Sequence, residues 1–380
     1  MPSRLLNLAL LALMPLALAS CVVAQEAGGR SKQAPADRVI EMGRGAALAG
    51  LPFTGAVASP FTCSSSGQVY VGEYAVGTEG RFVSTIPDLY RVSPLGQVKH
   101  LTMPMPTGYA SIDRLSFFSG ENALVALIGA SQPIDENGKS GPLGGASFLS
   151  ATDADGDHAR LIRLNLDFDP VQAAVFATDE FLVVGTAPAT FEPSIALLDR
   201  NGQLIRYVDI FPQKAGDDGA NAKQDTAGAQ VRKPASVLTG SMVRLAPWGS
   251  DILLVLPGID GSAVYHFRAS GQFERIPIQL PSDQSVLGIL GSGGRENWVI
   301  LTRSSASMTK FSQSRVVENP EDSLYEVSSH SGETLNRLLV HGPRPGEVAC
   351  AADGKLTALW VWWPDGAKAP DGFVFASVLR

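Results

Sequence analysis

Three aspartates alternate along a short segment that could chelate a cation. Asp153, Asp155 and Asp157 surround Gly156, and closely spaced carboxylates are typical calcium ligands. An EF-hand loop, however, keeps its glycine one place after the third acidic position, whereas here the glycine falls between the second and third acids. An Asp-Gly hairpin turn accounts for the same residues without a metal. Calcium binding and a plain turn are therefore alternatives.

Charged residues in five other positions are candidate ligand-binding groups, because each lies in or beside a segment expected near the centre of the fold. These residues are Asp113, Arg114, Arg244, Arg344 and Glu347. If the strands of the fold surround a narrow central channel, charges that face this channel require partners. They would bind a small anion or a sugar, or else pair with one another across the channel.

Common catalytic motifs are absent from the sequence. There is no Gly-x-Ser-x-Gly nucleophile elbow and no phosphate-binding loop. The five histidines show no metal-ligand spacing: His100, His158, His266, His330 and His341. The sequence therefore indicates neither a nucleophile nor a phosphate site. We expect a binding protein without a resident cofactor, and catalysis stays open as the alternative.

The amino-terminal residues have the features of an export signal. Arg4 supplies a positive charge, and residues 5–18 are mostly apolar and are followed by small residues. This stretch is too short to span a bilayer and has the charge order of a signal peptide. Residues 25–36 are small and polar, as in a flexible tether.

Leu18-Ala19-Ser20-Cys21 resembles the lipobox of bacterial lipoproteins, in which the cysteine becomes the acylated first residue. The resemblance implies lipidation at Cys21 and a periplasmic or cell-surface location. Cleavage after Ala24, which would give a soluble secreted protein, is the alternative. The predicted division is a signal peptide at 1–20, a tether at 21–36 and one folded domain at 37–380.

Cys63 and Cys350 remain if Cys21 is acylated. Each lies four residues before a glycine, at the same place in a repeat. An oxidising envelope would permit a disulfide between them, which would fasten the two ends of the domain. Two buried thiols of similar origin are the alternative, because equivalent strands can lie beyond the reach of a disulfide.

Composition favours a soluble domain rich in turns. Of 380 residues, 45% are hydrophobic and 18% are charged, with 39 glycines and 25 prolines, which suits a globular chain with many turns. The formal net charge is −7. Because no basic run appears, we expect no nucleic acid partner, and we expect membrane contact only through the lipid anchor.

Short apolar runs bounded by turn residues recur through the chain. Consecutive apolar positions are typical of strands buried on both faces. The runs are residues 69–71, 123–128, 181–184, 252–256, 298–301 and 356–360. A second hairpin follows most of them, so each repeat comprises four antiparallel strands.

This repeat resembles the blades of six-bladed β-propellers of the NHL-repeat and TolB-like kind. The resemblance implies an all-β fold of six four-stranded blades. The sixth unit has only three strands, so residues 38–42 are expected to pair with it and close the ring, which would cover an exposed edge. A β-sandwich or two smaller β domains is the alternative.

Long connections indicate where a ligand would bind. Residues 75–84, 130–145, 212–234, 303–322 and 364–371 all fall between second and third strands or between blades. These connections should share one face, and loops often carry binding function. We therefore expect a monomeric, envelope-associated binding or scaffold protein that presents this face to a protein or carbohydrate partner. A calcium-dependent lactonase-like hydrolase, acting at the channel mouth, is the alternative.

Overall fold

The described part of the chain is built from strands alone. The computed structural model describes residues 35–41, 46–47, 57–74, 89–95, 97–135, 137–139, 144–188, 193–210, 243–256, 263–294, 296–304, 322–341, 350–352, 355–362 and 372–378. All of them belong to the compact unit Pro35–Arg380. Among these residues, no helix is long and apolar enough to cross a membrane.

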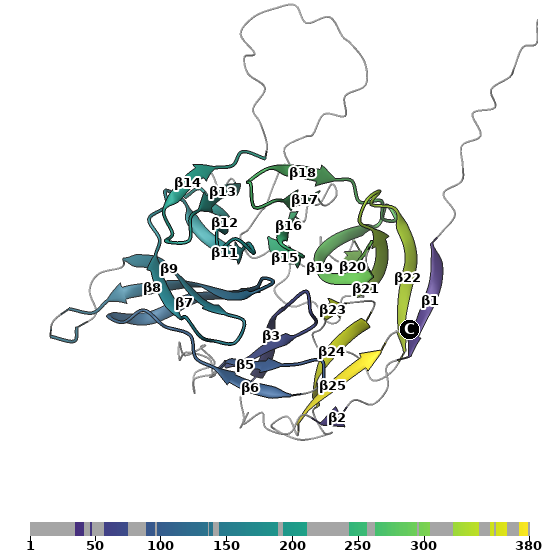
Figure 1. The fold of residues 1–380 in the computed structure, drawn as a ribbon, viewed down its shortest axis with the longest axis horizontal. Coiled ribbons are helices and arrows are strands. Elements are labelled where there is room, and N and C mark those ends of the chain that lie inside the picture. The colour runs from purple at the N-terminus through teal and green to yellow at the C-terminus, as the bar shows by residue number, and fades with distance from the viewer. Residues whose placement is uncertain are drawn as a thin grey trace, which may run out of the picture. The chain divides into compact units, whose positions relative to one another are not determined.

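Four separate antiparallel sheets of four strands follow one another along the chain (Figure 1). The first contains β3 (Val57–Cys63), β4 (Val69–Tyr74), β5 (Leu89–Val92) and β6 (Val98–Leu101). The second contains β7 (Tyr109–Ser119), β8 (Ala123–Pro133), β9 (Gly145–Asp153) and β10 (Arg160–Arg163). The third contains β11 (Asp169–Val175), β12 (Phe181–Thr186), β13 (Pro193–Leu198) and β14 (Leu204–Tyr207). The fourth contains β15 (Arg244–Trp248), β16 (Asp251–Leu256), β17 (Ala263–Phe267) and β18 (Phe273–Ile276).

The fifth sheet has nine strands. Its antiparallel unit of four comprises β19 (Gln284–Gly294), β20 (Asn297–Ser304), β21 (Asp322–Ser328) and β22 (Thr334–His341). It continues through β23 (Cys350–Ala352), β24 (Lys355–Trp362) and β25 (Gly372–Val378). Two short strands from the other end of the unit complete it, β1 (Ala36–Glu41) and β2 (Ala46–Ala47).

The sheets form a β-propeller, because their first strands meet in succession. Contacts join β3 to β7, β7 to β11, β11 to β15, β15 to β19 and β19 to β23. β7 also contacts β15. Inner strands that touch their neighbours in chain order are what radial repetition of small sheets produces. The all-β propeller expected from the sequence is therefore confirmed.

The expected six separate blades are wrong, because the described residues form five sheets. β23 pairs with β19 in parallel through Gly291 and Ala351, so the last strands continue the fifth sheet. Gly291 has φ of +130°, and a Cβ there would overlap the Ala351 carbonyl. Close approach of the two backbones is thus possible only without a side chain.

The expected partner of the closing strand is also wrong. Residues 36–41 form β1, which pairs in parallel with β22 and not with the last strands. A later segment, β2, pairs antiparallel with β25 instead. Arg38 explains part of the attachment of β1, because its Nη1 lies 3.3 Å from the Glu326 carboxylate on β21.

Five of the six predicted apolar runs lie on the second strands of the five sheets, and the sixth lies on β24 of the fifth sheet. Their side chains pack between neighbouring sheets, as strands buried on both faces should. One cluster joins the first and second sheets through Tyr70, Leu89, Leu124 and Ile128. Further clusters join the second, third and fourth sheets, and the fourth and fifth. The side chains of residues 356–360, on β24, lie outside the described residues.

Candidate functional site

A pocket of about 800 Å³ opens between the second and third sheets. Its walls are residues 129–131 of β8, 145–147 of β9, the connection 163–168, the start of β11, and Pro188 after β12. These positions lie where connections from second to third strands meet a connection between sheets. This is the face on which the long loops were expected, although most residues of those loops lie outside the described ones. The volume falls within the range of ordinary small-ligand sites.

Arg114 lies at this pocket and holds the two sheets together. Its guanidinium makes two parallel contacts with the Asp169 carboxylate, Nη1 to Oδ1 at 2.7 Å and Nη2 to Oδ2 at 2.9 Å, and it also donates to the Pro170 carbonyl. This fork geometry fixes the arginine in orientation. Gly129 leaves space for it, because a Cβ there would lie 3.0 Å from the Arg114 Cβ. The sequence predicted Arg114 as a candidate but missed Asp169.

The connection between β10 and β11 supplies the polar wall of the pocket. Arg163, Asn165 and Asp167 are exposed, whereas Leu164 and Phe168 are buried. This alternation turns three polar side chains to one side of the segment. The same alternation of polar and apolar residues is readable in the sequence and is the signal that could have found this wall.

Asp167 and Arg163 differ in the partners of their charged groups. The Asp167 side chain hydrogen-bonds with Tyr207, and partial burial together with this bond raises the pKa of the Tyr207 hydroxyl. Arg163, in contrast, has no carboxylate of a described residue within ion-pair distance, while Arg114 is matched by Asp169. The pocket therefore contains one guanidinium whose charge is not neutralised by a described neighbour.

A strained residue borders the same wall. Gln132 has φ of +56°, a conformation uncommon outside glycine. It follows Ser131, whose hydroxyl lies 2.6 Å from that of Ser111. Such outliers concentrate at functional sites, and Gln132 lies next to the lining residue Ser131.

The other predicted channel residues do not line the pocket. Asp113 lies in β7 where the register shifts, between Ile112 and Arg114, and its side chain is outside the described residues. Arg244 lies on the inner strand β15 and donates to the Val243 carbonyl at 3.0 Å. The surrounding protein desolvates its guanidinium and lowers the pKa of Arg244. Arg344 and Glu347 lie outside the described residues, so their role stays a prediction.

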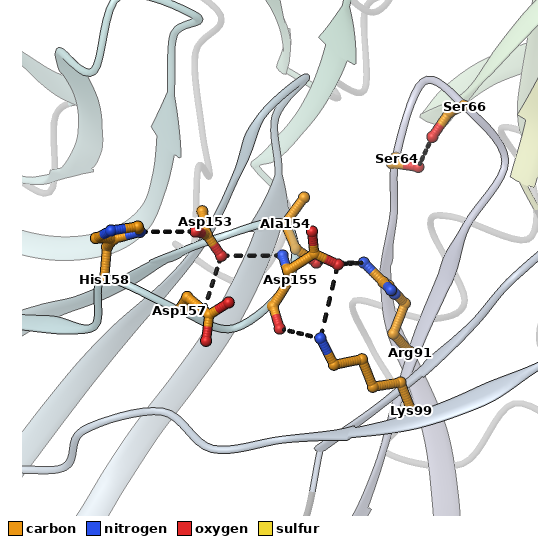
Figure 2. A network of polar contacts seen from close by, with 9 residues as sticks. All are labelled: Ser64, Ser66, Arg91, Lys99, Asp153, Ala154, Asp155, Asp157 and His158. Atoms are coloured by element: carbon orange, nitrogen blue, oxygen red, sulfur yellow. Dashed lines mark hydrogen bonds and ion pairs between the residues drawn. The ribbon is translucent and has the colours of Figure 1, made fainter.

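The acidic turn between β9 and β10 uses its carboxylates for local contacts (Figure 2). Asp153 Oδ1 accepts the backbone N–H groups of Asp155 at 3.0 Å and Asp157 at 2.8 Å. Its Oδ2 lies 2.9 Å from His158 Nδ1, which lowers the pKa of Asp153 and raises the pKa of His158. These bonds are those of an Asx-stabilised hairpin turn. Calcium binding here stays untested, and no group of three potential metal ligands occurs among the residues the structure describes.

The same turn also joins two sheets. Arg91 donates to Asp155 Oδ1 at 2.9 Å, and Lys99 donates to the Asp155 carbonyl at 2.7 Å (Figure 2). Both basic residues belong to the first sheet. Equivalent contacts recur further along: Arg160 with the Arg200 carbonyl, and Arg206 with the Gly271 carbonyl. This repetition indicates that the turns connect neighbouring sheets of the propeller.

Of the predicted cysteine features, only Cys63 can be followed. It is disulfide-bonded, and its partner's sulfur lies outside the described residues. Cys21 also lies outside them, and the side chain of Cys350 is not described. Lipidation and the Cys63–Cys350 pairing therefore stay predictions.

Comparison with known proteins finds only remote similarities. The sequence matches no protein-family profile and no curated protein. Among solved structures, an exo-β-1,3-galactanase from Clostridium thermocellum is 10% identical with a TM-score of 0.36, over 80% of this chain and 61% of that one. The GH43 protein BlXynB from Bacillus licheniformis is 11% identical with a TM-score of 0.36, over 86% and 58%. A putative dipeptidyl aminopeptidase IV from Bacteroides ovatus is 12% identical with a TM-score of 0.39, over 82% and 44%.

These similarities are remote and carry no argument. The chain spans less than two thirds of the length of each of these three proteins. At such low identity and TM-score they carry no information about the chemistry of this pocket. Any function must therefore be argued from the residues themselves.

Proposed function

We propose that this protein is an exported binding propeller. Its pocket between the second and third sheets binds part of a protein or carbohydrate partner. The observation that supports it best is the joint presence of a cavity of about 800 Å³ and convergent polar groups on its walls. Concave sites with a few oriented polar groups are the usual form of a ligand site. Arg114, fixed by Asp169, gives one wall a rigid orientation.

A large side chain placed in the pocket should weaken ligand binding. Ser147 lies on the wall formed by β9, so Ser147→Trp would place a large side chain in the cavity. We expect this variant to bind at least about tenfold more weakly than the wild type, because the ligand and the indole would compete for one volume. Binding would be measured on an array of glycans and on a purified fraction of envelope proteins.

Ser66→Trp is the matched control. Ser66 is exposed on the turn between β3 and β4, away from the pocket walls. It should bind as the wild type does, with an unchanged melting temperature in both variants. Equal binding by Ser147→Trp and the wild type would show that the ligand uses another surface.

We also propose that the mature chain begins at lipidated Cys21 and that Cys63 bonds to Cys350. Only three cysteines occur in the sequence, and Cys63 is disulfide-bonded. If Cys21 carries lipid, only Cys350 is left as the partner. Under this proposal the protein is monomeric, reaches the membrane through its anchor alone, and needs no bound cofactor.

The intact mass of the protein from native envelopes tests this arrangement. We expect a chain starting at Cys21 with added acyl mass and two hydrogens fewer than the reduced form. A chain starting at Gln25, or two cysteines open to alkylation without reduction, would contradict it. Stoichiometric calcium in the same preparation, with lactone hydrolysis, would instead favour a calcium-dependent hydrolase.

A further inference from the structure

The three exposed polar side chains of the β10–β11 connection form a ladder along the pocket. Arg163 is the last residue of β10, Asn165 follows it in the connection, and the chain bends at Asp167. All three line the pocket. Each ends in a planar group with two or more hydrogen-bonding atoms. Such groups suit pairs of adjacent hydroxyls, which a sugar presents along its ring.

The walls are poorly suited to a peptide or a protein surface. β8 and β9 are paired on both sides, so among the walls only the edge strands β7, β10 and β11 could accept an added strand. Phe168, the aromatic residue among the described lining residues, is only 4% exposed. No Trp or Tyr is among the described lining residues, whereas such aromatic anchors are typical of the centre of protein interfaces. A small, polar, hydroxyl-bearing ligand fits this surface better.

The charged residues of the pocket indicate which charge the ligand carries. Arg114 is neutralised by Asp169 in a two-point contact, whereas the described partner of Asp167 is the neutral hydroxyl of Tyr207. Arg163 keeps its positive charge without a carboxylate from a described residue. A guanidinium in a concave site binds a carboxylate through two parallel hydrogen bonds.

We infer that the pocket binds a short oligosaccharide that carries a carboxylate, with Arg163 on the carboxylate and Asn165 and Asp167 on ring hydroxyls. This inference rests on the proposed function and adds the chemical class of the ligand. Pro188, an exposed apolar residue of the lining, would face the carbon side of the rings.

Calorimetric titration with a panel of short uronate oligomers tests the inference. The panel comprises galacturonate, glucuronate and mannuronate dimers and trimers, with the corresponding neutral oligomers and a glutamate-rich peptide as comparisons. We expect at least one uronate to bind the wild type about tenfold or more tightly than its neutral counterpart. Arg163→Ala should weaken uronate binding about ten- to hundred-fold and remove most of the preference for the acid.

Arg275→Ala is the matched control, because Arg275 is also exposed but lies on β18, outside the pocket. It should leave the affinity unchanged. The inference is overturned if no uronate binds, if neutral sugars bind as well as uronates, or if Arg163→Ala and Arg275→Ala behave alike. Should a peptide or protein bind in a way that Ser147→Trp abolishes while uronates do not, the proposed pocket function would stand and the sugar assignment would fail.

Discussion

Gly332→Ala is expected to destabilise the propeller by about 3 kcal/mol or more, from left-handed backbone strain and forced overlap together. Gly332 has φ of +67° and is buried in the turn between β21 and β22. A Cβ there would overlap the carbonyl oxygen of Pro277, a backbone atom of the segment that follows the fourth sheet. Since a backbone carbonyl cannot rotate away as a side chain can, the two segments would have to separate.

Gly138→Ala separates strain from overlap. Gly138 has φ of +75°, but no heavy atom lies within 4 Å of the place that a Cβ would take, so an added methyl group would meet open space. We expect only the strain penalty there, about 1 kcal/mol. Urea unfolding of the two variants measures the difference. Equal losses of stability would contradict a close contact between the turn at Gly332 and Pro277.

Glu326→Ala should be the second strongly destabilising change. The Glu326 side chain is only 7% exposed. Its carboxylate accepts from Arg38 at 3.3 Å, Asn297 at 3.1 Å and Asn336 at 2.8 Å, which belong to β1, β20 and β22. Removing it leaves three donors without their acceptor, and we expect a loss of about 3 kcal/mol. Thermal unfolding and amide exchange in residues 36–41 would both report it, because β1 loses its ion pair.

Glu274→Ala is the control for charge removal at a surface. Glu274 is 57% exposed and contacts Arg268 at 3.1 Å and His266 at 3.3 Å. Exposed ion pairs contribute less than about 1 kcal/mol, so this variant should unfold close to the wild type. Glu326→Gln should lie between the two, because the amide oxygen still accepts one hydrogen bond. A Glu326→Ala variant as stable as Glu274→Ala would contradict the account of how β1 is held.

Most strands could be predicted, because a strand buried on both faces leaves a run of apolar residues in the sequence. Runs such as Ile252 to Leu256 are apolar at every position, and so short a run between turn residues is typical of a strand packed on both faces. Turn residues marked the hairpins equally well, and Asp153 to Gly156 is the turn between β9 and β10. The nine-residue strand β9 before it was underestimated, because small residues such as Ala146 and Ser147 carry little apolar signal.

Pairing between distant segments could not be predicted in the same way. Whether β23 starts a separate sheet depends on one close approach, at Gly291 and Ala351. Whether β1 joins β22 or the last strands depends on contacts such as Arg38 with Glu326. Neither contact leaves a periodic pattern in the sequence, since each involves single residues far apart in the chain.

The candidate site shows the same limit. Arg114 was found because a charge stood in an apolar strand segment, which is a local signal. Asp169, its partner, and the ladder of Arg163, Asn165 and Asp167 matter only because two sheets meet there. In the sequence, a polar connection that lines a pocket cannot be told from any other loop, because the residues across the pocket are far away in the chain.

Crystals of the mature protein soaked with the uronate oligomers test the central claim most directly. The account predicts a sugar bound between the second and third sheets, with its carboxylate against Arg163 and its hydroxyls against Asn165 and Asp167. A sugar bound only elsewhere, or a pocket that stays empty while the protein binds the same oligomer in solution, would contradict it.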